Sequence, residues 1–480
     1  MFERCEESAA VIDRICAASL AENRAAGARL AAIGELDALR LRECGERESW
    51  VSDTWDAISA EVAAALNISQ ALASSYLNYS RAMRNRLPRI GTALIAGEIS
   101  YSTFQTIVYR TDLITDSDVM AAVDTELATR VRRWPSMTRG RLSAAVDRVV
   151  ARADRDAVRR AREQQADREF SLWDGGNGLT EVFGRLVTTD ARVVDARLNA
   201  LAHSVCDGDT RTVKQRRADA LAALAAGAER LRCRCRQPTC PAATSPVPSP
   251  VVIHVVASQS SVDGTAPEPA ALIGTDALIP AELVAQLADS ARLRPLTQPG
   301  CAPAERGYVS SQALADFVRC RDLTCRFPGC DKPATETDLD HTIPHAQGGA
   351  THASNLKCLC RQHHLVKTFW GWRDRQLPDG TVIWTSPSGR TYVTTPGSAL
   401  LFPDLCAPTG EVVARVRPEP CTDRYAMMPQ RRRTRAQSHA NYVTAERRLN
   451  RQARERLQTA SAATQLTPQG RLPDGEPPPF

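Results

Sequence analysis

The stretch CRFPGCDKPATETDLDHTIPHAQGGATHASNLKCLCRQHHLVKTFW, residues 325–370, decides how this 480-residue chain is interpreted. It holds five of the eight histidines, and such clustering of a scarce residue indicates a functional site. Cys325 and Cys330 form a C-x4-C pair, and Cys360 and His363 form a C-x2-H pair. Each spacing lets two side chains meet one tetrahedral Zn2+, so together they predict a Cys3His structural zinc site. Such a site would stabilise a short module with little core of its own, because metal binding is then folding free energy.

Four further polar residues of this stretch are not needed for that zinc: Asp340, His341, Asn355 and His364. We expect Asp340 and His341 where a strand runs into a loop, and Asn355 where the next helix begins. On that helix His363 and His364 point about 100° apart, because successive helical residues rotate by that angle. Adjacent histidines can therefore serve two metals, one structural and one catalytic, and the spacing leaves open which serves which.

The chemistry that these residues favour is phosphodiester hydrolysis. A neutral histidine such as His341 can take the proton of a water molecule near pH 7. A divalent metal held by a carboxylate and an imidazole, such as Asp340 and His364, can bind the scissile phosphate and the leaving oxygen. We therefore expect a catalytic divalent metal (Mg2+, Mn2+, Ni2+ or Zn2+) beside the structural Zn2+, with an asparagine fixing the loop that orients the base.

The strings DLDHTIPHAQGG and SNLKCLCRQHHLVKT resemble the HNH nuclease motif, whose ββα-metal fold is shared by homing endonucleases, colicin-type nucleases and many phage enzymes. The resemblance implies an HNH endonuclease in which His341 is the general base. It makes Asp340 and His364 the ligands of the catalytic metal, and Asn355 the central asparagine of the motif. It also implies that the structural zinc of the Cys-containing branch, with a histidine in place of the usual fourth cysteine, is bound by Cys325, Cys330, Cys360 and His363.

The whole chain resembles the actinobacterial 13E12 repeat family, in which a long helical domain of unknown function precedes a C-terminal HNH module. The strings CRFPGC, DLDHTIP and NLKCLCRQHHLVKT carry this resemblance, which covers most of residues 30–400. The helical part brings no function that can be transferred.

The rest of the chain predicts a mainly α N-terminal domain with a small α+β central part, then the zinc-stabilised ββα-metal module and a disordered basic tail. Ala, Leu and Ile at helical spacing without Pro predict one long helix or a helical hairpin at the start. Alternating apolar residues on both sides of a Gly-rich turn predict a hairpin in the central part. The expected parts are a helical domain at 1–165, a mixed α/β part at 166–300 with a Pro/Ser linker near 241–250, the HNH module at 315–375, a β-hairpin extension at 376–405 and a basic, largely disordered tail at 406–480, which could form a helix at 441–458.

A second cysteine group lies in the central part. Cys233, Cys235 and Cys240 have a C-x-C-x4-C spacing that could hold a metal, but a closed zinc site needs four ligands. Cys206 or His254 would complete it.

The positive charge of the chain is concentrated near its C-terminus. Residues 421–460 hold ten arginines and three acidic residues, which accounts for the whole net charge of +6. Such a segment is typical of an electrostatic arm for a polyanion, although a solvated tail has the same composition. The expected contacts with nucleic acid are Arg431, Arg432, Arg433 and Arg435.

Two functions remain. The first is a metal-dependent HNH endonuclease that hydrolyses phosphodiester bonds in DNA. The alternative is a zinc-stabilised DNA-binding protein of a mobile element or regulatory system, without nuclease activity; short helices within residues 55–110 would suit a helix-turn-helix. No apolar run is long enough for a membrane span and the N-terminus has no signal-peptide pattern, so we expect a cytoplasmic protein whose partner is DNA. The sequence does not indicate its oligomeric state.

Overall fold

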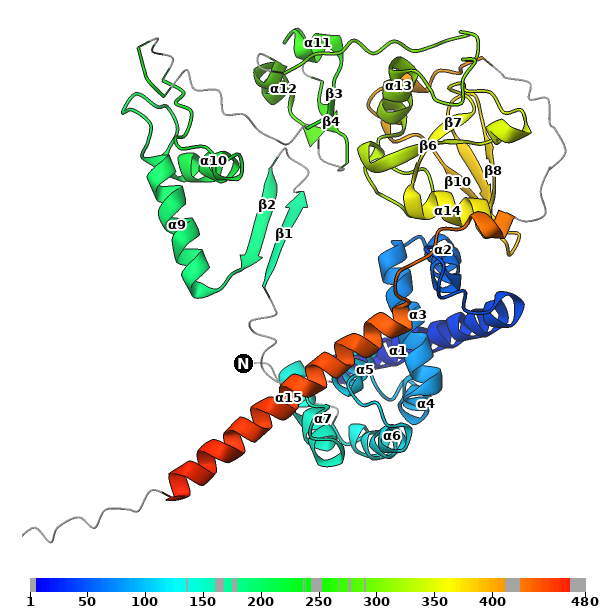
Figure 1. The fold of residues 1–480 in the computed structure, drawn as a ribbon, viewed down its shortest axis with the longest axis vertical. Coiled ribbons are helices and arrows are strands. Elements are labelled where there is room, and N and C mark those ends of the chain that lie inside the picture. The colour runs from blue at the N-terminus through cyan, green and yellow to red at the C-terminus, as the bar shows by residue number, and fades with distance from the viewer. Residues whose placement is uncertain are drawn as a thin grey trace, which may run out of the picture.

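The structure is a computed structural model. It describes residues 6–134, 137–159, 168–174, 179–235, 237, 239–242, 253–266, 268–274, 278–288, 291–410 and 424–466. Figure 1 shows a helical N-terminal region, a central part of helices and short strands, and a C-terminal part with two small sheets. None of the described helices has both the length and the apolar character that a membrane crossing requires.

The N-terminal region consists of helices packed around a large apolar core and a smaller one between α1, α2 and α3. Its first 39 helical residues form a single rod, because nothing in this Ala-rich segment interrupts the backbone hydrogen bonds. The shorter helices begin at polar caps: the Asp53 side chain accepts a hydrogen bond from the amide of Asp56, and Ser69 caps the next helix. Leu30, Phe104 and their apolar neighbours fill the core. The helices are α1 (Glu6–Cys44), α2 (Thr54–Leu66), α3 (Gln70–Asn85), α4 (Pro88–Ile95), α5 (Tyr101–Thr111), α6 (Ser117–Val131) and α7 (Arg139–Ala153).

The central part contains a hairpin, a helix pair and a small three-stranded sheet. The expected hairpin is confirmed by the antiparallel pairing of its two strands. Most of the Pro/Ser linker, residues 243–250, lies outside the described residues. The elements are β1 (Glu169–Asp174), β2 (Thr180–Arg185), α9 (Thr188–Ala202), α10 (Val213–Ala225), β3 (Val255–Val256), α11 (Gln259–Val262), β4 (Ala270–Leu272), β5 (Leu278–Ile279) and α12 (Ala281–Ala288).

The C-terminal part begins with α13 (Gln312–Asp322), and two strands and a helix follow it. Strand β6 (Thr337–His341) pairs antiparallel with β7 (Leu356–Cys360), and α14 (Arg361–Phe369) starts directly after β7. The next three strands form a separate antiparallel sheet that contains the expected hairpin: β8 (Arg373–Gln376), β9 (Val382–Thr385) and β10 (Thr391–Thr394). Short 3-10 turns lie at Ala334–Glu336, His345–Gln347, Gly397–Ala399, Pro403–Cys406 and Arg424–Met427.

The basic tail differs from the expectation. It was expected to be largely disordered apart from a helix at 441–458. The structure has a longer helix there, the 32-residue α15 (Arg435–Leu466), which lies along the N-terminal helices (Figure 1). Asp154 forms an ion pair with Arg447 at 2.6 Å, and Asp156 forms ion pairs with both Arg451 and Arg454. Composition alone indicated disorder because it did not show that the arginines have carboxylate partners within the chain. Residues 411–423 and 467–480 lie outside the described part.

The C-terminal part packs directly against the start of α2. The indole of Trp370 lies 5.6 Å from that of Trp50, and its Nε1 donates to the carbonyl oxygen of Ser52 at 3.0 Å. Leu365 and Met428 complete this small apolar cluster. The two regions therefore share a packed interface beside the first turns of α14.

Candidate functional site: a Cys/His cluster and an adjacent carboxylate-histidine centre

The structure brings the four predicted zinc ligands together. Cys325 and Cys330 lie in the loop after α13, Cys360 ends β7, and His363 is in the first turn of α14. Their donor atoms all lie within 4.8 Å of one another. The Nδ1 atom of His363 is 3.3 Å from the Sγ of Cys360 and 3.7 Å from that of Cys325. A closed set of three sulfurs and one nitrogen suits a structural Zn2+.

The surroundings fix the imidazole of His363. The ring of Phe327 stacks on it with centroids 4.1 Å apart and planes inclined by 8°. Its Nε2 donates a hydrogen bond to the Oε1 of Gln70 on α3. The Nδ1 atom therefore keeps its lone pair, which faces the thiols and can bind a metal. Burial raises the pKa of the Cys325 thiol, so a thiolate there requires a cation beside it. A metal ion would meet that requirement.

A glycine makes the close approach of this loop to the N-terminal region possible. Gly329 has a φ of +73°, and a Cβ there would lie 2.6 Å from the carbonyl oxygen of Ile68. Gly389 also has a positive φ, +82°, but a Cβ there would meet nothing within 4 Å. Either alanine substitution carries the cost of about 1–2 kcal/mol for a left-handed residue. We therefore expect Gly329→Ala to lower the melting temperature further than Gly389→Ala, and equal melting temperatures would contradict the close approach.

A second group of polar side chains lies around His364, the residue that follows His363 on α14. The Nε2 of His364 is 3.4 Å from the Oδ1 of Asp340, while its Nδ1 is 3.0 Å from the Oδ2 of Asp338. The two aspartates are two residues apart on β6, so both point to the same face of the strand. His364 thus lies beside Asp340 and His363 beside the thiols, a placement that the spacing left open. The contact of Asp338 with His364 was not predicted.

Two lysines hold the other oxygen of Asp340. Lys357, opposite Asp340 in the strand pairing, and Lys367 on α14 both donate to Oδ2 at 2.6 Å. Burial would raise the pKa of Asp340, but the charges of the two lysines outweigh it and lower the pKa to about 2. Asp374 on β8 pairs with the same lysines at 2.5 and 3.2 Å and balances the second positive charge. These groups were not predicted from the motifs, although a lysine opposite an aspartate follows from the register of the hairpin.

His341 is buried at the end of β6 and has a defined tautomer. Its Nε2 is 3.0 Å from the Oγ1 of Thr351, and that hydroxyl donates to the carbonyl oxygen of Gly307 at 2.6 Å. The hydroxyl has one proton, so Nε2 must be the donor in the first contact and Nδ1 keeps its lone pair. Burial lowers the pKa of His341 to about 4, so the ring is neutral near pH 7. The ring of Tyr308 stacks over it at 5.3 Å.

Asn355 lies elsewhere than expected. It precedes strand β7, not a helix, because the helix starts only after Cys360. Its Oδ1 accepts from the amide of Ile343 at 2.8 Å, and its Nδ2 donates to the carbonyl oxygens of Ile343 and Ala350. The side chain therefore ties together both ends of the loop after His341, and it acts by positioning that loop.

The four arginines of the expected nucleic-acid arm differ in their contacts. Arg431 and Arg435 form ion pairs with Asp53 and Asp56, at distances between 2.5 and 3.0 Å. Arg432 and Arg433 are exposed. Two of the four side chains are thus engaged within the chain and two face solvent.

Asp340 and His364 place two potential metal-ligand atoms, Oδ1 and Nε2, 3.4 Å apart. Among the described residues, the groups with three or more potential ligand atoms within 4.8 Å are the Cys/His cluster at His363 and a four-cysteine cluster in the central part. Asp340 and His364 belong to neither and supply one oxygen and one nitrogen. A metal bound there would keep most of its coordination positions for water and phosphate, as catalytic sites require.

Comparison with known proteins gives the family but no activity. Residues 17–322 match the family described as a domain of unknown function, DUF222. The uncharacterized protein Rv3776 of Mycobacterium tuberculosis is 41% identical over 473 residues, covering 92% of this chain and 90% of the relative. The uncharacterized protein Rv2100 of the same organism is 43% identical over 472 residues, covering 89% and 85%. No solved structure matches the chain. With a family match over more than half of its length, the chain belongs to the DUF222 family.

Proposed function

We propose that this protein is a metal-dependent endonuclease of the HNH type that hydrolyses phosphodiester bonds in DNA. The observation that carries the proposal is the placement of a buried, neutral His341 next to Asp340, whose free oxygen faces the imidazole of His364. The order of β6, β7 and α14 agrees with the ββα arrangement that the motif resemblance implies.

In this proposal the residues have separate tasks. The Nδ1 of His341 accepts a proton from the attacking water, because Nε2 is committed to Thr351. Asp340 and His364 would hold a divalent metal, which would supply charge stabilisation for the phosphate and the leaving oxygen. Asp338 orients His364 through its Nδ1, and Asn355 holds the loop that carries the base. The thiols of the zinc cluster must stay reduced, so we place the protein in the cytoplasm.

A DNA-binding protein without nuclease activity is the second candidate. The two lysines on Asp340 favour it, because they already compensate the charge of this carboxylate without a metal. Such a protein would use the Cys/His cluster for stability and the exposed arginines for binding DNA.

Nicking of supercoiled plasmid DNA separates the two candidates. The endonuclease requires that purified protein convert the plasmid to the open or linear form in the presence of Mg2+ or Mn2+ and that a chelator stop the reaction. Asp340→Asn should remove this activity, while binding of the same DNA is retained. Binding without metal-dependent nicking, across the metals named above, would support the second candidate and exclude the first.

The salt dependence of DNA binding tests the exposed part of the arm. If Arg432 and Arg433 contact phosphates, each contact releases condensed counterions when it forms. Replacing both by alanine should then make the slope of log affinity against log salt shallower by about 0.9 per lost contact on duplex DNA. Arg14 and Arg192 are exposed arginines on other helices and give a matched control pair. If the variant that lacks Arg432 and Arg433 has an unchanged salt slope, these two arginines do not contact DNA phosphates.

A further inference from the structure

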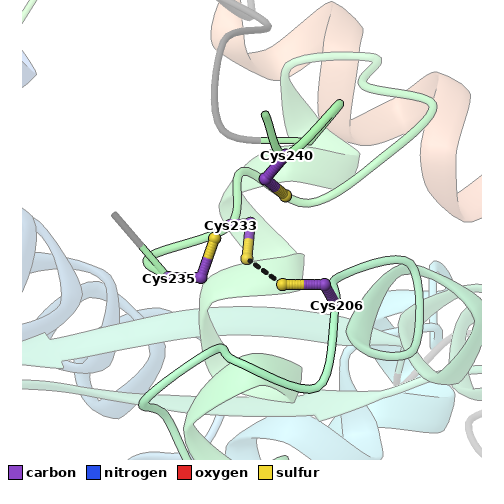
Figure 2. Close-up of side chains that lie close together, drawn as sticks. All are labelled: Cys206, Cys233, Cys235 and Cys240. Carbon is purple, nitrogen blue, oxygen red and sulfur yellow. Dashed lines mark hydrogen bonds between the residues drawn. The ribbon is translucent and has the colours of Figure 1, made fainter. Parts of the chain in front are cut away.

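The central part contains a second cysteine cluster, which the proposed nuclease site does not use. Figure 2 shows the side chains of Cys206, Cys233, Cys235 and Cys240 pointing toward one another. Cys206 follows the end of α9, and the other three lie in the loop after α10. Their Sγ atoms all lie within 4.8 Å of one another. Of the two candidates for the fourth position, Cys206 is therefore the one in the cluster, and the exposed His254 is not part of it.

The distances between the sulfurs suit a metal and not a disulfide. All four cysteines are free, and the Sγ atoms of Cys206 and Cys233 are 3.5 Å apart. A disulfide requires about 2.05 Å. Four thiolates at about 2.3 Å from a tetrahedral Zn2+ lie about 3.8 Å from one another. The observed cluster is close to this spacing without any covalent bond.

The local packing gives an independent reason for a metal. The helices around the cluster bury very little: α9 buries only Leu201 and Ala202, and α10 only Ala220. The apolar cluster at their end consists mainly of the cysteines themselves, joined by Val205 and Ala242. A unit of this size cannot be held by so small a core, and a metal commonly supplies the missing free energy in small domains.

The loops that carry the thiols are fixed by contacts of their own. The carboxylate of Asp209 accepts from the guanidinium of Arg211 at 2.7 Å and from the amide of Arg234 at 2.9 Å. Arg211 also donates to the carbonyl oxygen of Arg232 at 2.6 Å. These bonds tie the segment after Cys206 to the one around Cys233, so the cysteines of both segments meet. Arg232 and Arg234 alternate with the cysteines and would offset the negative charge of four thiolates around one divalent ion.

We propose that Cys206, Cys233, Cys235 and Cys240 bind a structural Zn2+ that holds the α9–α10 unit together. Four protein ligands close the coordination sphere, so the site has a structural role and leaves no position for a substrate. The proposal does not depend on the nuclease activity. It implies that each chain holds two structural zinc ions in separate parts of the molecule, in addition to any catalytic metal.

Elemental analysis of the full-length chain, after dialysis against a weak chelator, is the first test. We expect two zinc ions per chain in the wild type, one in Cys235→Ser and one in Cys330→Ser, with Cys16→Ser, at an exposed position outside both clusters, as the control. Hydrogen exchange should show lost protection over residues 188–242 in Cys235→Ser only, and over residues 325–370 in Cys330→Ser only. Two zinc ions retained in Cys235→Ser, or iron in place of zinc, would overturn the proposal.

Because a misfolded variant would lose both metals, the wild type provides a second measurement. Native protein is alkylated with iodoacetamide and each cysteine is followed by mass spectrometry. Cys235 and Cys240 should react slowly until a strong chelator removes zinc, whereas the exposed Cys16 reacts at once. Rapid reaction of Cys235 in the zinc-containing chain contradicts the site. Protection that a reductant removes and a chelator does not would indicate a disulfide and also contradict it.

Discussion

Replacing His341 by alanine is expected to slow metal-dependent plasmid cleavage by about a hundredfold to ten-thousandfold, the usual cost of losing a general base. The fold should change little, because within the described part of the chain this ring makes one hydrogen bond, to Thr351, and it is not a member of the Cys/His cluster. DNA affinity, measured without metal, should stay within a few-fold of the wild type. Initial rates under single-turnover conditions give the comparison.

The matched control for this substitution is His203→Ala, an exposed histidine at the end of α9. It should leave the rate unchanged, which excludes a general effect of losing an imidazole. Cleavage by His341→Ala within a few-fold of wild type would remove His341 from the mechanism. A reduced rate accompanied by a lowered melting temperature would mean that the ring acts through stability.

Replacing Cys330 by serine should remove one zinc ion and destabilise the C-terminal part. Structural zinc sites contribute apparent binding free energies of about 10–16 kcal/mol in small zinc domains, more than the stability of a typical domain. The half-buried Cys330 is a better choice than Cys325, whose buried sulfur also accepts a hydrogen bond from the amide of Cys360. We expect a lower melting temperature and lost zinc together, and added zinc should not restore either.

Cys16→Ser is again the control, because this thiol is exposed on α1. A Cys330→Ser protein with unchanged zinc content and an unchanged melting temperature would show that the ligand set is misassigned. Cys330→His offers a rescue, since an imidazole is also a zinc ligand. Partial recovery of zinc in that variant would separate loss of a ligand from a packing defect.

The members of the Cys/His cluster could be predicted because their signal is local. Two short spacings bring Cys325 to Cys330 and Cys360 to His363, and the amide of Cys360 donates to the sulfur of Cys325, which joins the two pairs. The partners of Asp340 could not be found in this way, because Lys367 comes from a helix and Asp374 from a separate sheet. Their contacts depend on how these elements pack. The sequence motifs thus indicate the candidate metal ligands but not the charged side chains around them.

The helices could be predicted where local composition determines them. They could not be predicted where ion pairs with distant residues stabilise them. The long helix α1 follows from an Ala-rich segment without proline. The low apolar content of the tail indicated disorder with at most a helix at 441–458, whereas α15 extends from Arg435 to Leu466. Its stability comes from ion pairs such as Arg447 with Asp154, whose partners lie about three hundred positions earlier. No sequence pattern within α15 itself indicates these carboxylate partners.

The position of α15 has a consequence for the order in which the protein assembles on the ribosome. Asp53 and Asp56 emerge early in synthesis, whereas their partners Arg431 and Arg435 emerge much later, with separations of up to 382 positions. Until then the two close carboxylates have local partners, such as the amide of Asp56 that donates to Asp53, but lack these cations. The two arginines reduce the repulsion between the carboxylates once they leave the exit tunnel. A nascent chain that stops before residue 431 therefore lacks four ion pairs at the start of α2.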